Sequence, residues 1–81
     1  MPRRDSTDEV LGALGRIGFQ SQRQRGSHIR LSAQWRGATR YVTIVAGQRQ
    51  LDPKTVNSIC RQAGITLREL DLLVEGDEIR E

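Results

Sequence analysis

Two runs in the middle of the chain, in which apolar and polar residues alternate, restrict the fold most. In residues 28–33, HIRLSA, every second residue is apolar, and a period of two is typical of a strand with one buried face. Residues 40–45, RYVTIV, supply β-branched and aromatic side chains for a second strand, and Arg36 and Gly37 are suited to the turn between the two. The sequence therefore predicts an antiparallel hairpin whose outer face carries His28 and Arg30 and whose apolar face needs a second layer.

A capping box predicts where the first helix begins. The Ser6 side chain can accept a hydrogen bond from the backbone of Glu9, while the Glu9 carboxylate reaches back to the amide of Ser6. An apolar stripe at helical spacing follows, made of Val10, Leu11, Leu14 and Ile17. Gly18 suits the left-handed conformation that ends many helices. We therefore expect a helix from about Thr7 to Ile17.

Two more helices are expected after the hairpin. Asp52 is a good N-cap and Pro53 fits the first helical position, so a helix should begin there and end at Gly64. A second capping box, residues 66–69, begins a shorter helix whose apolar stripe continues to Val74. Each of these helices has one apolar face, which must pack against another layer.

These elements predict an α+β fold, a two-layer sandwich in the order α-β-β-β-α with a short C-terminal helix. Both main helices should cover one face of an antiparallel sheet, and the polar segment FQSQRQ, residues 19–24, is expected to add at most a short edge strand. We assign residues 1–74 to one domain, because 81 residues are too few for two cores. The acidic residues 75–81 have little to bury, so we expect a flexible tail.

Charge is distributed unevenly along the chain, and this distribution indicates a partner. Between residues 16 and 61, nine basic side chains accompany the single acid Asp52, a net charge of +8. Residues 69–81 contain six acids and one base, a net charge of −5. A strongly basic segment favours a polyanion as the binding partner, and nucleic acid is the polyanion that we expect.

Several features indicate a cytoplasmic protein without a metal or cofactor. The single cysteine, Cys60, cannot form an internal disulfide and falls on the apolar face of a predicted helix. The opening residues, MPRRDSTDEV, have no apolar run, so we expect no signal peptide, and we expect no membrane-spanning segment. One histidine and one cysteine, far apart, give no zinc-ligand spacing, and the glycine-rich loop of nucleotide-binding proteins is missing.

The segment RQRGSHIRL, residues 23–31, brings the only histidine together with three arginines. Cleavage of RNA by the neighbouring 2′-hydroxyl needs a base for the proton, a cation for the charged phosphorane and an acid for the departing 5′-oxygen. An imidazole, whose ordinary pKa is about 6.5, can act as base or acid near neutral pH. His28 is therefore the candidate general acid or base, and the candidate phosphate or RNA contacts are Arg23, Arg25, Gly26, Ser27, Arg30 and Lys54.

Other interpretations of the same residues stay open. Gly26 either allows a phosphate to approach the backbone or simply forms a bend, and Ser27 fits both. One histidine cannot take both proton transfers at once, so Tyr41, Lys54 or water must supply the second group. For the whole domain, a noncatalytic RNA-binding module, or one half of a protein complex whose basic face an acidic partner covers, would use the same surface.

The order of these segments resembles a known family. The helix ending LGRIGF, the segment RQRGSHIRL, the strand YVTIV and the helix LDPKTVNSICRQAGIT together are similar to the HicA family of bacterial toxins, over about Thr7 to Leu73. RGSH before a strand, combined with the pattern L-x-P-x-T-x-x-x-I-x-R-Q-A-G-I, is a fairly specific combination.

The resemblance implies both a fold and a function. HicA proteins are small mRNA interferases, metal-independent endoribonucleases with a fold like that of double-stranded-RNA-binding domains, and a HicB antitoxin neutralises them. The histidine of their GSH motif is the catalytic residue, a role that falls on His28 here, with Gly26 and Ser27 as its motif neighbours. We therefore expect the toxin of a type II toxin–antitoxin system, with mRNA as substrate and a HicB-like protein as partner.

Overall fold

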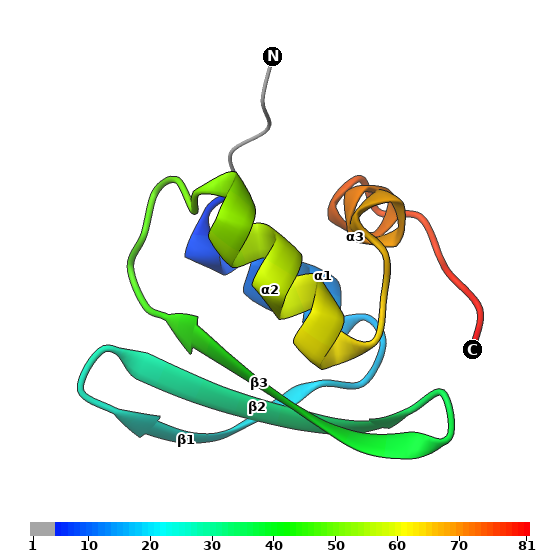
Figure 1. Ribbon diagram of the computed structural model, residues 1–81, viewed down its shortest axis with the longest axis horizontal. Helices are drawn as coiled ribbons and strands as arrows, with labels where there is room; N and C mark the ends of the chain where they lie inside the picture. Colours follow the sequence, from blue (N-terminus) through cyan, green and yellow to red (C-terminus); the bar gives the residue numbers. More distant parts are fainter. Residues whose placement is uncertain (1–4) are drawn as a thin grey trace.

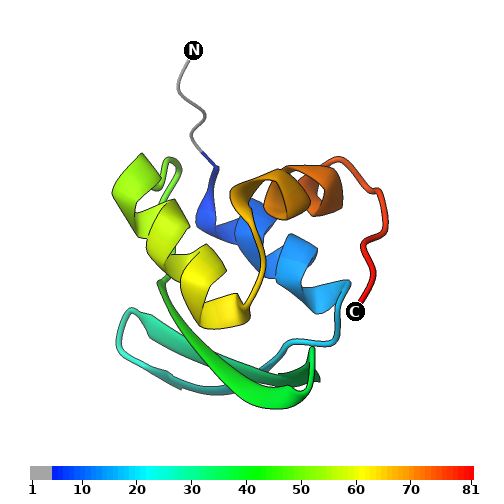
Figure 2. The ribbon, with the colours of Figure 1, turned by 45° about the vertical axis from the view of Figure 1, so that its right-hand side comes forward.

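The computed structural model describes residues 5–81, which form three helices and three strands: α1 (Thr7–Gly15), β1 (Gln20–Arg25), β2 (His28–Trp35), β3 (Ala38–Val45), α2 (Pro53–Ala63) and α3 (Leu67–Val74). The strands form one antiparallel sheet in the order β1-β2-β3. Figures 1 and 2 show α1 and α2 on one side of this sheet, with no described helix on the other side, which we call the open face. The α+β prediction is confirmed, and the arrangement is consistent with that of double-stranded-RNA-binding domains.

The caps predicted for the three helices are all present. The Ser6 hydroxyl accepts a hydrogen bond from the Glu9 amide at 3.1 Å, and the Glu9 carboxylate accepts one from the Ser6 amide at 3.0 Å. The Asp52 side chain caps α2, and a second capping box, residues 66–69, begins α3. These bonds satisfy amides of the first turn that have no partner within a helix.

Helix α1 ends at Gly15, two residues before the predicted Ile17. The reason is that its last turn tightens to bonds between residues three apart, from the Ile17 amide to the Leu14 carbonyl and from the Gly18 amide to the Gly15 carbonyl. The Phe19 amide then bonds to the Leu14 carbonyl at 3.1 Å, and Gly18 has a φ of 98°, as its sequence position predicts.

The predicted hairpin is β2 and β3, joined by a two-residue turn at Arg36 and Gly37. Val42 and Ile44 are both buried, as predicted, and point to the helices. They belong to a single hydrophobic cluster, which also contains Cys60. Within the described residues, no helix has the length and apolar composition that crossing a bilayer requires. Residues 1–4, part of the segment on which the signal-peptide expectation rests, lie outside the described residues.

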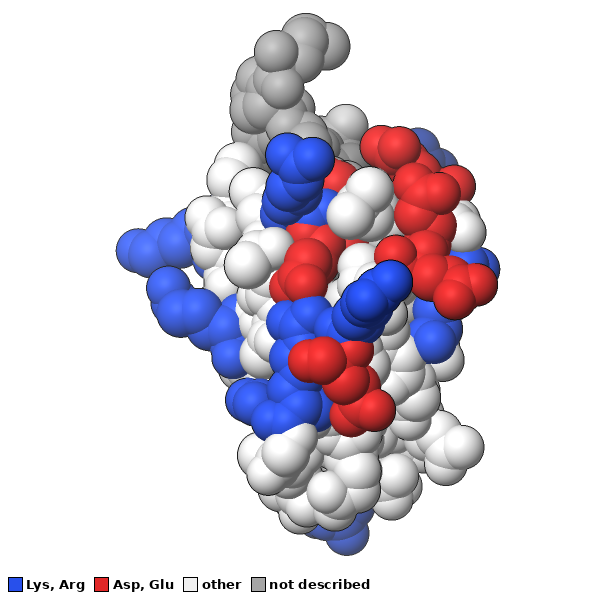
Figure 3. All heavy atoms as spheres, turned by 90° about the vertical axis from the view of Figure 1, so that its right-hand side faces the viewer, with Lys and Arg blue, Asp and Glu red and all other residues white. Residues whose placement is uncertain are grey.

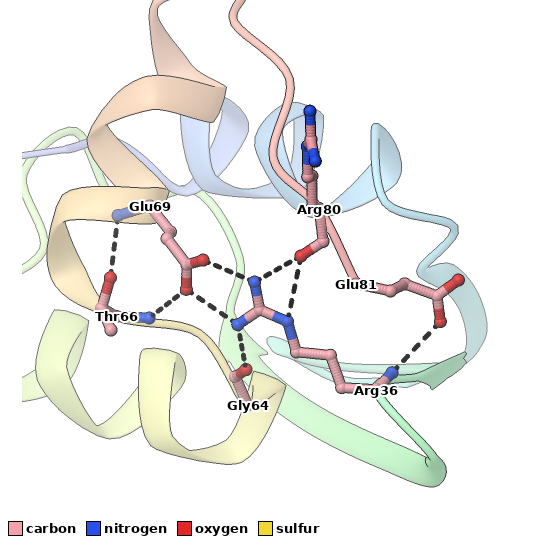
Figure 4. Close-up of polar contacts among 6 residues, drawn as sticks. All are labelled: Arg36, Gly64, Thr66, Glu69, Arg80 and Glu81. Carbon is pink, nitrogen blue, oxygen red and sulfur yellow. Dashed lines mark hydrogen bonds and ion pairs between the residues drawn. The ribbon is translucent and has the colours of Figure 1, made fainter.

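Helix α3 and the residues after it pack on the end of the molecule that holds the β2–β3 turn. Figure 4 shows the Arg36 guanidinium from that turn paired with the Glu69 carboxylate on α3, and donating to the carbonyls of Gly64 at 3.1 Å and Arg80 at 2.6 Å. Residues 75–81 have no regular secondary structure, although Ile79 is partly buried against the core. The flexibility predicted for residues 75–81 stays a prediction.

Candidate functional site

The turn between β1 and β2 places His28 at the first position of β2, directly opposite Arg25. Gly26 and Ser27 form this two-residue turn, and Gly26 has a φ of 58°. Two-residue hairpins of type II′ place glycine at this first turn position, because a side chain there would strain the backbone. The Gln24 side-chain amide also donates to the Gly26 carbonyl at 3.1 Å. The GSH motif is thus a tight turn that ends on the histidine.

The strand register brings the sequence-predicted cations together on the open face. Arg25 pairs with His28, and Arg23 pairs with Arg30 in the next outward row. On the other side of β2, Thr43 of β3 lies opposite Arg30. Side chains opposite each other in adjacent strands point to the same face of a sheet. A shallow hollow of about 170 Å³ results, which we call the cationic hollow, lined by Arg23, Arg25, His28, Arg30 and Thr43.

A β-bulge in β1 is what turns its two arginines outward. Ser21 lies opposite Leu31, whereas Arg23 lies opposite Arg30, so Gln22 is an extra residue in β1. Without this extra residue, Gln22 would face Arg30 and both β1 arginines would point to the helix side, because side chains alternate along a strand. The bulge therefore determines that β1 contributes guanidinium groups to the hollow.

The end of β3 beneath the hollow is held in place by α1. Thr7, in the first turn of α1, is 1% exposed, and its hydroxyl donates to the Val45 carbonyl at 2.7 Å. The same hydroxyl accepts a bond from the Gln48 amide at 3.0 Å. Directly after Val45, the Ala46 amide donates to the Ser27 carbonyl at 2.6 Å. These bonds join the GSH turn to the core.

The hollow has an uncompensated positive charge. Within residues 5–81, none of its three arginines forms an ion pair with a carboxylate, and Arg30 is instead stacked on the ring of Tyr41 at 4.8 Å from its centroid. Figure 3, which looks onto the opposite end of the molecule with α3 and the C-terminal segment, shows acidic and basic side chains side by side. Three guanidinium groups without a carboxylate partner within residues 5–81 therefore lie with His28 around the hollow, where they are available to a phosphate.

Not every predicted residue lines the hollow. Gly26 and Ser27 form the turn beside it, and Lys54 is exposed in the first turn of α2; none of these three lines the hollow. Thr43 is a lining residue that sequence reasoning missed. Its signal was present in the second alternating run, where Thr43 lies between the inward residues Val42 and Ile44 and must therefore point outward.

Among the side chains that line the hollow, as far as residues 5–81 extend, His28 is the only one of a type that commonly binds metal ions. Among the described residues, no three His, Cys, Asp or Glu side chains gather in a group that could hold a metal ion. The groups that line the hollow are one imidazole, three guanidinium groups and one hydroxyl. This set can bind a phosphodiester, stabilise additional negative charge on it and transfer a proton.

The chain was compared with families and with curated proteins. A family model described as the HicA toxin of bacterial toxin–antitoxin systems matches residues 7–65, from the start of α1 to the residue after the α2 cap. No curated protein matches the chain. The match contains the GSH turn, all three strands and the whole cationic hollow, and it covers more than half of the 81 residues. The chain therefore belongs to the HicA family of bacterial toxins.

Proposed function

We propose that this protein is the toxin of a type II toxin–antitoxin system and that it cleaves mRNA without a metal ion, with His28 as a general acid or base. The observation that carries this proposal is the cationic hollow, in which the only imidazole of the chain lies among three guanidinium groups that have no carboxylate partner within residues 5–81. Membership of a toxin family supports the toxin role.

In the proposed reaction, the 2′-hydroxyl of a ribose attacks the adjacent phosphorus while its proton leaves. The bond to the 5′-oxygen of the next nucleotide then breaks, and that oxygen takes up a proton. The products are a 2′,3′-cyclic phosphate and a free 5′-hydroxyl. His28 makes one of the two proton transfers, and positioned acid–base catalysis of this kind contributes about 10²- to 10⁴-fold to a rate.

The guanidinium groups have a different role in this proposal. The phosphorane formed by attack carries more negative charge than the phosphodiester, so cations fixed beside it stabilise the transition state more than the ground state. Arg25 lies opposite His28, and Arg30 follows two residues later on the same outward side of β2. A phosphate in the hollow would therefore meet cations from two strands with the imidazole beside it.

A noncatalytic RNA-binding role is the second candidate, and one observation favours it. Among the residues lining the hollow, His28 is the only one with a side chain of the type commonly used in general acid–base catalysis, so the second proton transfer must involve water or a group that arrives with the RNA. Tyr41 and Lys54, the protein groups considered for this step, do not line the hollow. Binding without cleavage would use the same arginines but would not need the imidazole.

We further propose that a HicB-like antitoxin neutralises the protein and that both act in the cytoplasm, where mRNA is found. An antitoxin that covers the hollow would need acidic or other anionic groups, because the open face there is cationic. Lys54, on α2, is proposed as an additional RNA contact outside the hollow, and Gly26 and Ser27 as backbone contacts at the turn.

Cleavage of a chimeric RNA tests the proposed reaction. Purified protein is incubated in EDTA with a short single-stranded RNA, and with the same RNA carrying a 2′-deoxyribose at the mapped cleavage position. We expect cleavage of the all-RNA strand to fragments with 2′,3′-cyclic phosphate ends, and no cleavage at the 2′-deoxy position. Cleavage at that position, or a requirement for a divalent metal, would overturn the proposed mechanism.

A further inference from the structure

Tyr41 is a large hydrophobic side chain exposed on the open face, with 52% of its surface accessible. It pairs with Ser32 across β2 and β3, and Arg30 pairs with Thr43 in the next outward row. Tyr41 and Arg30 are therefore diagonal neighbours on one face, close enough for long side chains to meet. The Arg30 guanidinium lies 4.8 Å from the centroid of the Tyr41 ring.

A second arginine, Arg36 in the turn between β2 and β3, shows what is unusual about this contact. Arg36 lies over the ring of Trp35 at 5.0 Å, but its guanidinium is also paired with the Glu69 carboxylate. That pair cancels the charge of Arg36 and raises the pKa of its guanidinium, mainly through the hydrogen bonds to Glu69. Arg36 is thus a structural cation, held by a carboxylate and unsuited to bind phosphate.

The Arg30 guanidinium, by contrast, is held by an aromatic ring. Within residues 5–81 it has no carboxylate partner. An aromatic ring attracts a guanidinium through its quadrupole and covers one face of it, without adding a negative charge that would repel a phosphate. A ring in this place can therefore limit the freedom of the side chain while leaving its full charge and its N–H donors to a ligand.

We infer that Tyr41 is a positioning residue, which holds the Arg30 guanidinium at the cationic hollow so that an RNA phosphate meets an already ordered cation. This inference rests on the proposed function, because it assigns Tyr41 to the binding of the same RNA. Ordering a long side chain before binding removes part of the entropy cost of the complex. Tyr41 thus acts on affinity through Arg30 and not through a contact of its own with the RNA.

The loss of RNA affinity when the Tyr41 ring is removed distinguishes this positioning role from direct stacking of the ring on a base. A cation–π contact at an exposed site corresponds to about 2- to 5-fold in affinity. Stacking of a nucleobase on an aromatic side chain corresponds to about 5- to 150-fold, and it would not depend on Arg30. The two roles therefore differ both in magnitude and in their dependence on the arginine.

A double-mutant cycle tests the inference. The His28→Gln protein is used as the parent so that the RNA stays intact, and binding of a fluorescein-labelled single-stranded RNA of mixed sequence is followed by anisotropy. The variants are Tyr41→Leu, Tyr41→Phe, Arg30→Gln and the double variant Arg30→Gln/Tyr41→Leu. Thr39→Ala, at the other end of the open face, is the control, because Thr39 contacts Gln34 and does not line the hollow.

We expect Tyr41→Leu to weaken binding by about 2- to 5-fold and Tyr41→Phe, which keeps the ring, to bind as the parent does. In the Arg30→Gln background, Tyr41→Leu should have no further effect. The slope of log affinity against log salt should stay unchanged in Tyr41→Leu but fall by about 0.7 in Arg30→Gln, because only the latter removes a charge.

Three other results would overturn the inference in different ways. An equal loss from Tyr41→Leu in both backgrounds would show that the ring contacts the RNA itself, and an undiminished affinity of Tyr41→Leu would show that the ring has no role; either result leaves the proposed function intact. A His28→Gln parent that does not bind the RNA would overturn the RNA-binding part of the proposed function and this inference together.

Discussion

Arg25 and His28 face each other across β1 and β2, and only Gly26 and Ser27 separate them along the chain. The tight turn and the backbone pairing therefore place both side chains beside the hollow that they line. Arg23 and Arg30 form the next outward row, so the arrangement needs no long loop to assemble. A site built on paired strands is held more rigidly than a site on loops.

This geometry predicts that Arg25 and Lys54, which the sequence offers equally as candidate RNA contacts, contribute differently to RNA affinity. Arg25→Gln should weaken binding of single-stranded RNA and lower the salt slope by about 0.7, because Arg25 lines the hollow. Lys54→Gln, on α2 and outside the hollow, should cause a smaller loss. Titrations at several salt concentrations measure both quantities. Equal losses in the two variants would show that the RNA is bound over α2 as strongly as in the hollow.

The pair of Arg36 and Glu69 predicts how stability depends on pH. Hydrogen bonds from Arg36 lower the pKa of Glu69 from 4.5 to about 2, against the opposing effect of burial. Above about pH 5, Glu69 is charged in the folded and unfolded chain, and the full stabilisation is present. As the pH falls from there towards 2, the unfolded chain binds the proton first, so the stabilisation is lost.

The substitution Glu69→Gln removes the ion pair with Arg36 but keeps the helix cap, because glutamine can still complete the capping box of α3. Both side chains of the pair are about a fifth to a quarter exposed, so solvent reduces its strength, and we expect a loss of about 1–2 kcal/mol at pH 7. The difference between wild type and variant should shrink as the pH approaches 2. Denaturant unfolding at each pH gives the free energies, with Glu78→Gln, an exposed carboxylate in the C-terminal segment, as the control. A difference that is constant from pH 7 to pH 2 would contradict the assignment.

Gly64 and Gly26 form a matched pair for a test of packing at the turn between α2 and α3. Both have a positive φ, 73° and 58°, at which alanine costs about 1 kcal/mol. A Cβ at Gly26 would meet nothing within 4 Å, whereas one at Gly64 would lie 2.6 Å from the Arg40 guanidinium. That guanidinium donates to the carbonyls of Trp35 and Arg36, so it cannot move without losing bonds.

We therefore expect Gly64→Ala to destabilise the protein by about 1 kcal/mol more than Gly26→Ala, measured by denaturant unfolding. In an Arg40→Ala background, which lacks the guanidinium that the new Cβ would contact, Gly64→Ala should lower the free energy of unfolding only as much as Gly26→Ala does. If the cost of Gly64→Ala is the same with and without Arg40, the contact is not the cause.

The sequence predicted the elements whose signals are local. Capping boxes identified the starts of α1 and α3, and the period of two identified β2 and β3 and the outward direction of His28 and Arg30. These predictions hold because each depends on residues within one or two turns, or one strand, of each other.

The remaining features depend on contacts between distant segments. β1 has no apolar residue, so no alternation of apolar and polar residues predicts a strand there. The strand forms through backbone pairing with β2. The bulge at Gln22, which turns Arg23 and Arg25 outward, has no sequence signal either. In the sequence, Arg36 is one more cation of a basic segment. Its partner Glu69 lies 33 residues away, so no local pattern indicates the ion pair.

The central claim is that the imidazole of His28 transfers a proton during RNA cleavage. Its most direct test is the single-turnover rate of RNA cleavage in EDTA by wild type and His28→Gln, together with the affinity of each protein for the same RNA. We predict that the variant folds and binds RNA within a few-fold of wild type, while its cleavage rate falls by at least about 10²-fold. A variant that cleaves at the wild-type rate would contradict the claim.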